Sequence, residues 1–337
     1  MSEIIKVENL VEVYADGTKA IDGISFSVKQ GEFFGFLGPN GAGKSTTIKV
    51  LTTLLRKTSG SVTIAGYDID KDAQNIRKVI GVQSQETVID GDLTGRENLI
   101  LQGNLQRMRG EVLEKRVDEL LKIVELSDVA NRKAAFYSGG MKKRLDLAST
   151  LVHKPKLIFL DEPTTGLDPQ SRNSVWKYLE ELNRNEGITI FLTTQNMEEA
   201  DKLCRNLSII DHGRIVVNGS PVELKQQIGG DSIALSFVNG LTGDEKEKSK
   251  QIIQNVKGIS KVLDTEDGLV VYAKNASSAV PEIVRVFDQN GVSLTSVNLS
   301  SPSLDDVFLQ HTGRRIRPAE LKKSSSSQAN LVSKRWR

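Results

Sequence analysis

A glycine-rich segment at residues 38–45 has the composition of a phosphate-binding loop. It fits the pattern G-x-x-x-x-G-K-[ST] and reads Gly38-Pro39-Asn40-Gly41-Ala42-Gly43-Lys44-Ser45. An apolar run at 33–37 precedes it and a helical pattern from Thr46 to Leu55 follows, which is the strand–loop–helix context that the pattern requires. The glycines let backbone N–H groups converge on phosphate oxygens, and the helix N-terminus adds a favourable dipole. We expect Lys44 to bind the β and γ phosphates of a nucleotide and Ser45 to ligate Mg²⁺.

A second element with chemical potential is the apolar run Leu157–Leu160, which ends in Asp161 and Glu162. The carboxyl edge of a parallel sheet is where ligands bind, so the first carboxylate should lie beside the phosphate loop. We expect Asp161 to hold the Mg²⁺ shell and Glu162 to act as general base on the attacking water. A strand that ends in two acids is common, and it is the preceding phosphate loop that favours this interpretation.

The elements around these residues predict an α/β fold with a largely parallel, doubly wound sheet. Alternating apolar residues at Ile5–Val13 and Ile24–Val28 indicate half-buried strands. Continuous apolar runs indicate strands covered on both faces, with helical stretches such as 44–55 and 170–185 between them. These runs are Phe33–Leu37, Leu157–Leu160, Ile188–Leu192 and Leu207–Ile210. Between about 95 and 150, apolar residues at helical spacing (Leu113, Val117, Leu120, Leu121, Val124) indicate a helical insertion.

The C-terminal third of the chain predicts a second, smaller domain. Gly229–Ser232 has the composition of a boundary, so we place a first domain at 1–228 and an α+β domain at 231–313. The second should contain a strand (Ile233–Val238), a helix (about 244–256), a strand pair around Asp267 and Gly268, a helix (about 277–290) and a strand (Val292–Val297). The tail from about 318 to 337, with its serine run and basic residues, is predicted to be disordered.

Composition gives few further constraints. Apolar residues make up 38% of the 337 and charged residues 26%, and the net charge of +2 favours no class of partner. From Arg314 to the end there are eight basic residues and one acid, a segment that could touch anionic lipid or simply be solvated. Because its only aromatic residue is Trp336, we expect no nucleic-acid partner. The single cysteine, Cys204, and the absence of a run of about 18 apolar residues favour a soluble, cytoplasmic protein.

The segment Tyr137-Ser138-Gly139-Gly140-Met141, just upstream of the Asp161 strand, resembles the signature motif of ABC ATPases. Ser138 can cap the helix that runs through Leu145–Leu151 and so offer a helix terminus to an anion. The resemblance implies that Ser138, Gly139 and Gly140 bind the γ-phosphate of ATP held by an opposite subunit. It therefore also implies a second ATPase subunit, with two copies enclosing two ATP molecules; both a homodimer and a heterodimer are open.

Other positions resemble ABC motifs in turn. Tyr14 is similar to the aromatic residue that stacks on adenine, although a core aromatic is the plain alternative. Gln85 resembles the Q-loop glutamine, which senses Mg²⁺ and the γ-phosphate, with Gln83 as the competing assignment. Asp168 resembles the D-loop aspartate that crosses the dimer interface, and with Pro169 after it also fits a helix N-cap.

One position departs from the ABC pattern. The segment Thr193-Thr194-Gln195-Asn196 matches the place where the family carries a switch histidine, and here it has Gln195. A glutamine amide can donate a hydrogen bond to the γ-phosphate, but it cannot carry a positive charge. We expect hydrolysis to persist, at a reduced rate, because Glu162 and Lys44 are present.

Within the ABC superfamily, the chain resembles the daunorubicin-resistance type of exporter ATPase. This rests on the segment Leu93–Leu99, on Tyr137 and Met141 in the signature, and on the closing pattern 302–314. The resemblance implies an ATP-hydrolysing motor subunit on the cytoplasmic face of a membrane, coupled to a separate transmembrane permease. A soluble, non-transport ABC ATPase is the alternative, and the single phosphate loop and the short insertion of about 55 residues argue against it.

Overall fold

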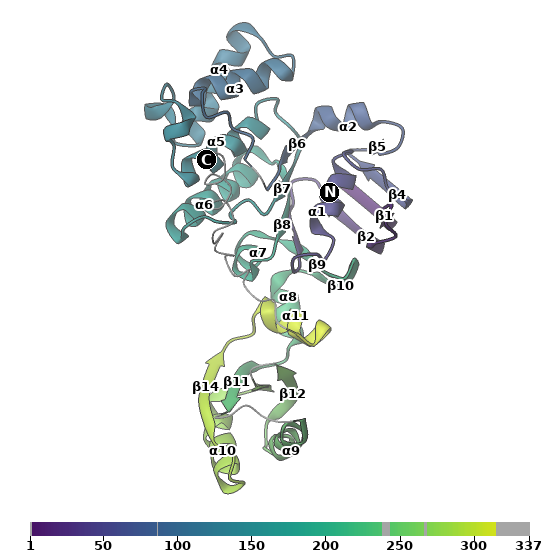
Figure 1. Ribbon diagram of the computed structural model, residues 1–337, viewed down its shortest axis with the longest axis vertical. Coiled ribbons are helices and arrows are strands. Elements are labelled where there is room, and N and C mark those ends of the chain that lie inside the picture. Colours follow the sequence, from purple (N-terminus) through teal and green to yellow (C-terminus); the bar gives the residue numbers. More distant parts are fainter. Residues whose placement is uncertain (1, 86, 238–242, 266–267, 315–337) are drawn as a thin grey trace, which may run out of the picture.

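The computed structural model describes residues 2–85, 87–237, 243–265 and 268–314. Within these residues the strands form three sheets and the molecule has an upper body and a smaller lower unit (Figure 1). The predicted disordered tail from 318 to 337, and Asp267 of the predicted strand pair, lie outside the described residues.

The central sheet of the body carries the phosphate loop. Its order is β10-β9-β3-β8-β7-β6, and every neighbouring pair is parallel except β9 and β10 at one edge. The strands are β3 (Phe33–Leu37), β6 (Ile80–Gln83), β7 (Leu157–Asp161), β8 (Thr189–Thr194), β9 (Asn206–Asp211) and β10 (Arg214–Gly219). Each residue of β3, β7 and β8 is buried, which explains their continuous apolar runs. The predicted largely parallel α/β fold is confirmed.

A second, antiparallel sheet covers one side of this body. It has the order β2-β1-β4-β5 and consists of β1 (Glu3–Val13), β2 (Lys19–Lys29), β4 (Ser59–Ile64) and β5 (Tyr67–Asp68). Its inner face shares one core with the central sheet, where Phe26 of β2 stacks on Phe34 of β3 at 5.7 Å between ring centroids. The first two strands were predicted, but their pairing with residues 59–64 was not.

Helices complete the body. The predicted insertion is confirmed as α3 (Gly95–Leu105), α4 (Gly110–Ile123) and α5 (Gly139–Thr150), with short 3₁₀ turns at Ser127–Val129 and Ala134–Phe136. Thr94 and Glu97 form a capping box that fixes the start of α3. The other helices are α1 (Lys44–Leu51), α2 (Ala73–Val79), α6 (Pro169–Glu186), α7 (Met197–Leu203) and α8 (Pro221–Gln227).

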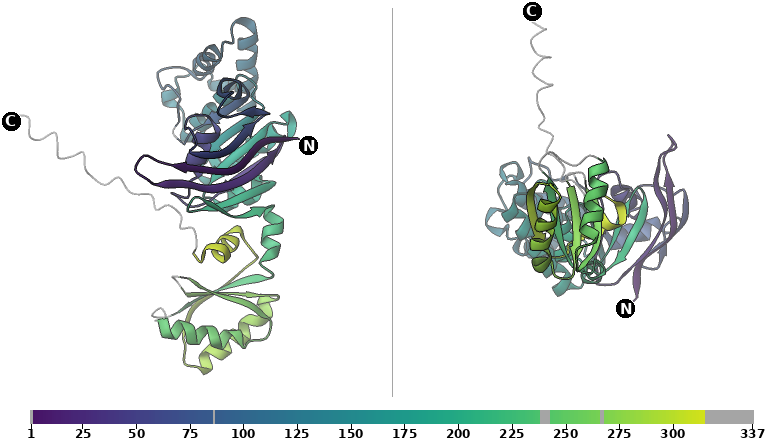
Figure 2. Two further views of the ribbon diagram at one scale, coloured as in Figure 1. Left: turned by 90° about the vertical axis from the view of Figure 1, so that its right-hand side faces the viewer. Right: turned by 90° about the horizontal axis from the view of Figure 1, so that it is seen from below.

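The lower unit has a β-α-β-β-α-β order of ferredoxin-like type. It comprises β11 (Asp231–Phe237), α9 (Gly243–Gln254), β12 (Ile259–Thr265), β13 (Gly268–Ala273), α10 (Ala276–Gln289) and β14 (Leu294–Ser300). The strands pair antiparallel in the order β12-β13-β11-β14. Helices α9 and α10 lie on one face of this sheet, and their apolar residues form a core of their own with it (Figure 2).

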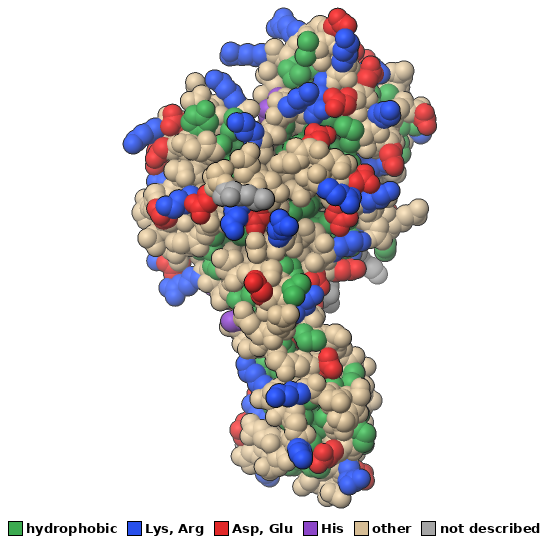
Figure 3. All heavy atoms as spheres, turned by 180° about the vertical axis from the view of Figure 1, so that it is seen from behind, with side chains coloured by type: hydrophobic (Ala, Val, Ile, Leu, Met, Phe, Trp, Pro, Cys, Tyr) green, Lys and Arg blue, Asp and Glu red, His purple; other side chains and the backbone are tan. Residues whose placement is uncertain are grey.

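A last helix, α11 (Leu304–Thr312), lies on the opposite face, between the sheet and the body (Figure 2). It packs against α7, α8 and β10 of the body, and its buried residues join the core of the body. Asp306 of α11 also accepts a hydrogen bond from the Tyr272 hydroxyl of β13 at 3.3 Å. The helix therefore connects the two parts at the place where the molecular surface narrows (Figure 3). On the face of the molecule drawn in Figure 3, basic and acidic side chains are interspersed.

Candidate active site

The phosphate loop lies between the end of β3 and the start of α1, as its sequence predicts. Gly41 and Gly43 have φ angles of 80° and 108°, which residues other than glycine rarely adopt. A Cβ on Gly43 would lie 2.5 Å from the Ala20 carbonyl oxygen, so the loop also needs glycine there to pass the neighbouring strand. This geometry leaves the loop's backbone free to curl around an anion.

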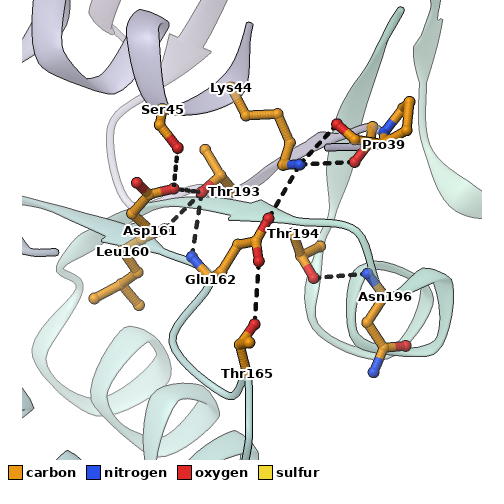
Figure 4. Close-up of polar contacts among 11 residues, drawn as sticks. Pro39, Lys44, Ser45, Leu160, Asp161, Glu162, Thr165, Thr193, Thr194 and Asn196 are labelled. Atoms are coloured by element: carbon orange, nitrogen blue, oxygen red, sulfur yellow. Dashed lines mark hydrogen bonds and ion pairs between the residues drawn. The ribbon is translucent and has the colours of Figure 1, made fainter. Parts of the chain in front are cut away.

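Lys44 is buried at the centre of the loop, with 4% of its side chain exposed. Its Nζ donates to the carbonyl oxygens of Gly38 (2.8 Å) and Pro39 (3.1 Å). It also forms an ion pair with Glu162 Oε1 at 3.1 Å (Figure 4). Lysine and glutamate therefore neutralise each other at the point where phosphate charge would enter.

The two carboxylates at the end of β7 face the loop from the other side (Figure 4). Asp161 Oδ1 accepts from Ser45 Oγ at 3.3 Å and from Thr193 Oγ1 at 2.6 Å. Glu162 has a φ of 49°, unusual for a residue other than glycine, and its N–H donates to the Thr193 carbonyl at 3.0 Å. Thr165 Oγ1 donates to the other Glu162 oxygen at 3.1 Å. The strained backbone and the threonine together fix the direction of the Glu162 carboxylate.

A cavity of about 500 Å³ opens over this cluster, within the range of small-molecule sites. Its lining residues are Tyr14, Thr18, Lys19, Ala20, Asn40, Gly41, Gly43, Lys44, Ser45, Thr46, Gln85, Glu162, His212 and Gly213. Tyr14 is 37% exposed, and its hydroxyl is 2.9 Å from Thr46 Oγ1. The cavity lining thus combines an aromatic ring (Tyr14) with a cation (Lys44) and a carboxylate (Glu162), the kinds of group that a nucleotide site uses.

The donor set also fits a hard cation. Ser45 and Asp161 offer oxygen ligands within hydrogen-bond distance of each other, which is the ligand type that Mg²⁺ takes. Within the described residues, no group of three or more His, Cys, Asp and Glu could hold a metal ion unaided.

The two glutamines after β6 differ in their surroundings. Gln83 is buried, and its Nε2 donates to Asp146 Oδ2 of α5 at 2.9 Å. Gln85 lines the cavity, while its carbonyl accepts from Lys143 Nζ of α5 at 3.1 Å. Burial lowers the pKa of Lys143 and raises the pKa of Asp146. Helix α5 therefore binds the Gln83–Gln85 segment at both of its ends.

The signature segment is at the N-terminus of the same helix. Ser138 caps α5 by accepting from the Met141 N–H at 3.2 Å. A Cβ on Gly140 would lie 2.8 Å from Ser171 Oγ, so the segment touches the start of α6. Asp168 caps α6 and accepts from Ser171 Oγ at 2.6 Å, a bond that lowers the pKa of Asp168. None of residues 138–140, nor Asp168, is among the described residues that line the cavity.

Gln195 follows β8 and is partly buried, and it too is absent from the described lining residues. The neighbouring Thr194 Oγ1 accepts from the Asn196 N–H at 2.9 Å (Figure 4). Asn196 in turn caps α7. The glutamine is therefore presented by a tight turn between a buried strand and a capped helix.

Several polar residues that the sequence interpretation omitted belong to this arrangement. Thr193 and Thr165 fix the two carboxylates, Lys143 and Asp146 hold the Gln85 segment, and His212 lines the cavity. Only Thr193 had a sequence signal, since it directly precedes Thr194 and Gln195 at the end of an apolar run. The other four become visible only when distant elements are brought together.

Comparison with known proteins agrees with this geometry. The profile described as "ABC transporter" matches residues 21–165, and that described as "ATP-binding protein DrrA1-3-like, C-terminal domain" matches residues 219–312. The daunorubicin resistance ATP-binding protein DrrA2 of Streptomyces coeruleorubidus is 38% identical over 328 residues, covering 95% of this chain and 98% of that protein. The linearmycin resistance ATP-binding protein LnrL of Bacillus subtilis is 35% identical over 316 residues, covering 93% of this chain and all of that protein (100%).

Solved structures match the body. The cbiO1 protein of Clostridium perfringens, part of the ABC transporter complex cbiONQ, is 32% identical with a TM-score of 0.63, covering 68% of this chain and 94% of that one. A dimeric, post-hydrolysis ATP-binding cassette bound to ADP and phosphate is 28% identical with a TM-score of 0.58, covering 64% of this chain and 98% of that one. With the phosphate loop, the cavity and both profile matches in agreement, the chain belongs to the ATP-binding, ATP-hydrolysing subunits of ABC transporters, in the group with the DrrA-like C-terminal domain.

Proposed function

We propose that two copies of this chain close around ATP–Mg²⁺ and drive an exporter. The observation that carries the proposal is the separation of two anion-binding features within one chain. The cavity holds Lys44 and Glu162, whereas the capped N-terminus of α5 at Ser138 lies outside it. A γ-phosphate bound in the cavity, at the N-terminus of α1, can therefore meet the N-terminus of an α5 helix only from a second chain. The dimeric solved relative bound to ADP and phosphate supports the same arrangement.

The residues that the sequence interpretation placed at this site have the following proposed roles. Tyr14 stacks on the adenine, and the loop from Gly38 to Thr46 holds the phosphates. Lys44 leaves Glu162 and binds the β and γ phosphates, while Ser45, Asp161 and Gln85 face the cation. Bound Mg²⁺ supplies positive charge to the phosphate oxygens. Glu162, freed from Lys44 and oriented by Thr165, accepts the proton of the attacking water.

Closure of the dimer follows from where ATP is shared. Ser138, Gly139 and Gly140 of one chain bind the γ-phosphate held by the other, and Asp168 lies near this contact through Ser171. Gln195 donates a neutral hydrogen bond to the γ-phosphate in place of the usual histidine. Loss of the γ-phosphate removes the shared contact, so ATP and ADP favour different states of the dimer.

The proposed partner is a separate transmembrane permease. No helix within the described residues is long and apolar enough to cross a membrane. Relatives named for daunorubicin and linearmycin resistance match more than nine-tenths of this chain. We therefore propose that the chain sits on the cytoplasmic face of a membrane and powers export of drug-like or lipid-like compounds. Residues 231–313 form its accessory domain.

The proposal is tested by ATP-dependent dimerisation. Light scattering on the purified chain and on Glu162→Gln, with phosphate release measured in parallel, should show a stable ATP–Mg²⁺ dimer of the variant and hydrolysis by the original chain. A matched control is Glu32→Gln, which changes a carboxylate of similar burial before β3, away from the phosphate loop. If neither protein dimerises and no phosphate is released, the self-sufficient homodimer is wrong.

A further inference from the structure

The turn between β9 and β10, residues Asp211–Gly213, lies between the nucleotide cavity and the C-terminal end of the described chain. Its His212 and Gly213 line the cavity. The Gly213 N–H donates to the carbonyl of Ala42 in the phosphate loop at 3.0 Å, and the Gly213 carbonyl accepts from the Asp22 N–H at 2.8 Å. A shift of this turn would therefore move the backbone of the phosphate loop, to which Gly213 is hydrogen-bonded.

The same turn is bound from outside by Arg314. Its Nη2 donates to Asp211 Oδ1 at 2.6 Å and lies 3.1 Å from His212 Nε2. The Asp211 side chain is only 10% exposed, although that of Arg314 is 49% exposed. Without the guanidinium, a largely buried carboxylate would lose its charged partner at the edge of the cavity.

Arg314 is placed by α11 rather than by a free tail. Gly313, with a φ of 74°, ends the helix, and Thr312 Oγ1 bonds to both the N–H and the carbonyl of Arg314 (3.4 and 3.1 Å). The other end of α11 is fixed by the Ser303–Asp306 capping box. Because Asp306 also accepts from Tyr272 of β13, the helix is tied to the accessory sheet.

A continuous set of contacts thus runs from the accessory sheet through α11 and Arg314 to the turn and on to Ala42. We propose that Arg314 is a positioning residue for nucleotide binding and that, through Asp211 and His212, the accessory domain sets the affinity of the phosphate loop. The inference rests on the proposed use of this cavity. Coupling of this kind is reciprocal, so bound nucleotide must also stabilise the docking of α11.

The alternative is an ion pair at the surface with no effect on binding, since many such pairs contribute little. Two features argue against it here. Asp211 is largely shielded from solvent, and the turn that carries it donates directly to the phosphate loop. The ion pair of Lys225 with Asp201 has the same 2.6 Å length, joins α8 to α7 and does not touch the cavity. It therefore provides a matched control.

The first measurement is the dissociation constant of a fluorescent ADP analogue for the full chain and three variants. Arg314→Ala should bind about two- to fivefold more weakly, the range that an ion pair with one exposed partner supports. Arg314→Lys should recover part of the loss, because it keeps the charge but not the two-partner geometry. Lys225→Ala should bind as the original chain does. If the original chain binds no nucleotide, the proposed function fails; if it binds and Arg314→Ala binds equally well, only the present inference fails.

The second measurement is hydrogen exchange of the α11 amides with and without ADP. Nucleotide should slow exchange in residues 304–312 of the original chain and of Lys225→Ala, but not of Arg314→Ala. This readout separates positioning from general destabilisation, which would raise exchange throughout the chain. Unchanged α11 protection on adding nucleotide to the original chain, or equal protection in Arg314→Ala, would overturn the proposal.

Discussion

Glu162 forms an ion pair with Lys44, the side chain expected to bind the phosphates of a nucleotide. Lys44 Nζ and Glu162 Oε1 are 3.1 Å apart, and their side chains are only 4% and 7% exposed. Water therefore screens this pair weakly. Since nucleotide must separate Lys44 from Glu162 before Lys44 can bind the phosphates, we predict that Glu162→Gln binds nucleotide more tightly even as it loses hydrolysis.

The size of the effect follows from what glutamine retains. Complete loss of one member of a buried pair costs about 3–5 kcal/mol. Glutamine keeps an amide oxygen that can still accept from Lys44, so the change is from a charged to a neutral acceptor. That difference is about 1–2 kcal/mol, which corresponds to roughly five- to thirtyfold in affinity. Hydrolysis should fall by about 10²- to 10⁴-fold, as expected for loss of a general base.

The assay is displacement of a fluorescent nucleotide by ADP, which reports affinity without turnover, with phosphate release from ATP measured separately. Glu32→Gln is again the control, because it neutralises a buried carboxylate that accepts from the Lys29 N–H and lies before β3 rather than at the phosphate loop. If Glu162→Gln binds ADP within twofold of the original chain while the control is unchanged, Glu162 does not compete for Lys44 and the reasoning is refuted.

Substitutions at three further positions test two other parts of the site and one buried acid of α7, Glu199, which accepts hydrogen bonds from Thr164 and Trp176. Tyr14→Ala should weaken nucleotide binding about tenfold, whereas Tyr14→Phe, which loses only the bond to Thr46, should stay within about threefold, both by displacement titration. Gly140→Ala places a Cβ 2.8 Å from Ser171 Oγ and should slow phosphate release about tenfold or more at unchanged affinity, as steady-state kinetics would show. Burial raises the pKa of Glu199 above its ordinary value of 4.5. The free energy of unfolding should therefore fall as the pH rises from 4.5 through the raised pKa, because the folded protein holds this proton more tightly than the unfolded chain does. Urea denaturation at a series of pH values should show this fall in the original chain and not in Glu199→Gln.

Much of the active site could be predicted from the sequence because its parts are local. The phosphate loop needs only a strand, eight residues and a helix start, and the Asp161–Glu162 pair directly ends a buried strand. Each of these signals is complete within one short, continuous stretch of the chain. Their meeting at one sheet edge follows from the parallel topology, which the alternation of strands and helices indicates.

What the sequence could not show depends on contacts between distant segments. The choice between Gln83 and Gln85 was open, because only the packing of Asp146 against Gln83 gives that glutamine a structural partner. Likewise, Asp211 and Arg314 are 103 positions apart in the sequence, so nothing local marks Arg314 as a neighbour of Asp211. The antiparallel pairing of β1 with residues 59–64 could not be predicted for the same reason, because it joins segments that are distant in the sequence.

The position of the Gln195 backbone is fixed by the strand that precedes it, β8. Thr193 at the end of β8 bonds to Asp161, and the carbonyl of Thr194 accepts from the Gly38 N–H at 3.1 Å. The backbone before residue 195 is therefore attached to both the carboxylate strand and the phosphate loop, whatever the side chain. Compared with the histidine that the ABC family carries at this position, a glutamine can still donate a hydrogen bond but cannot carry a positive charge. Lys44 remains as a fixed cation at the site, and we infer that the substitution changes the pH dependence of hydrolysis more than its geometry.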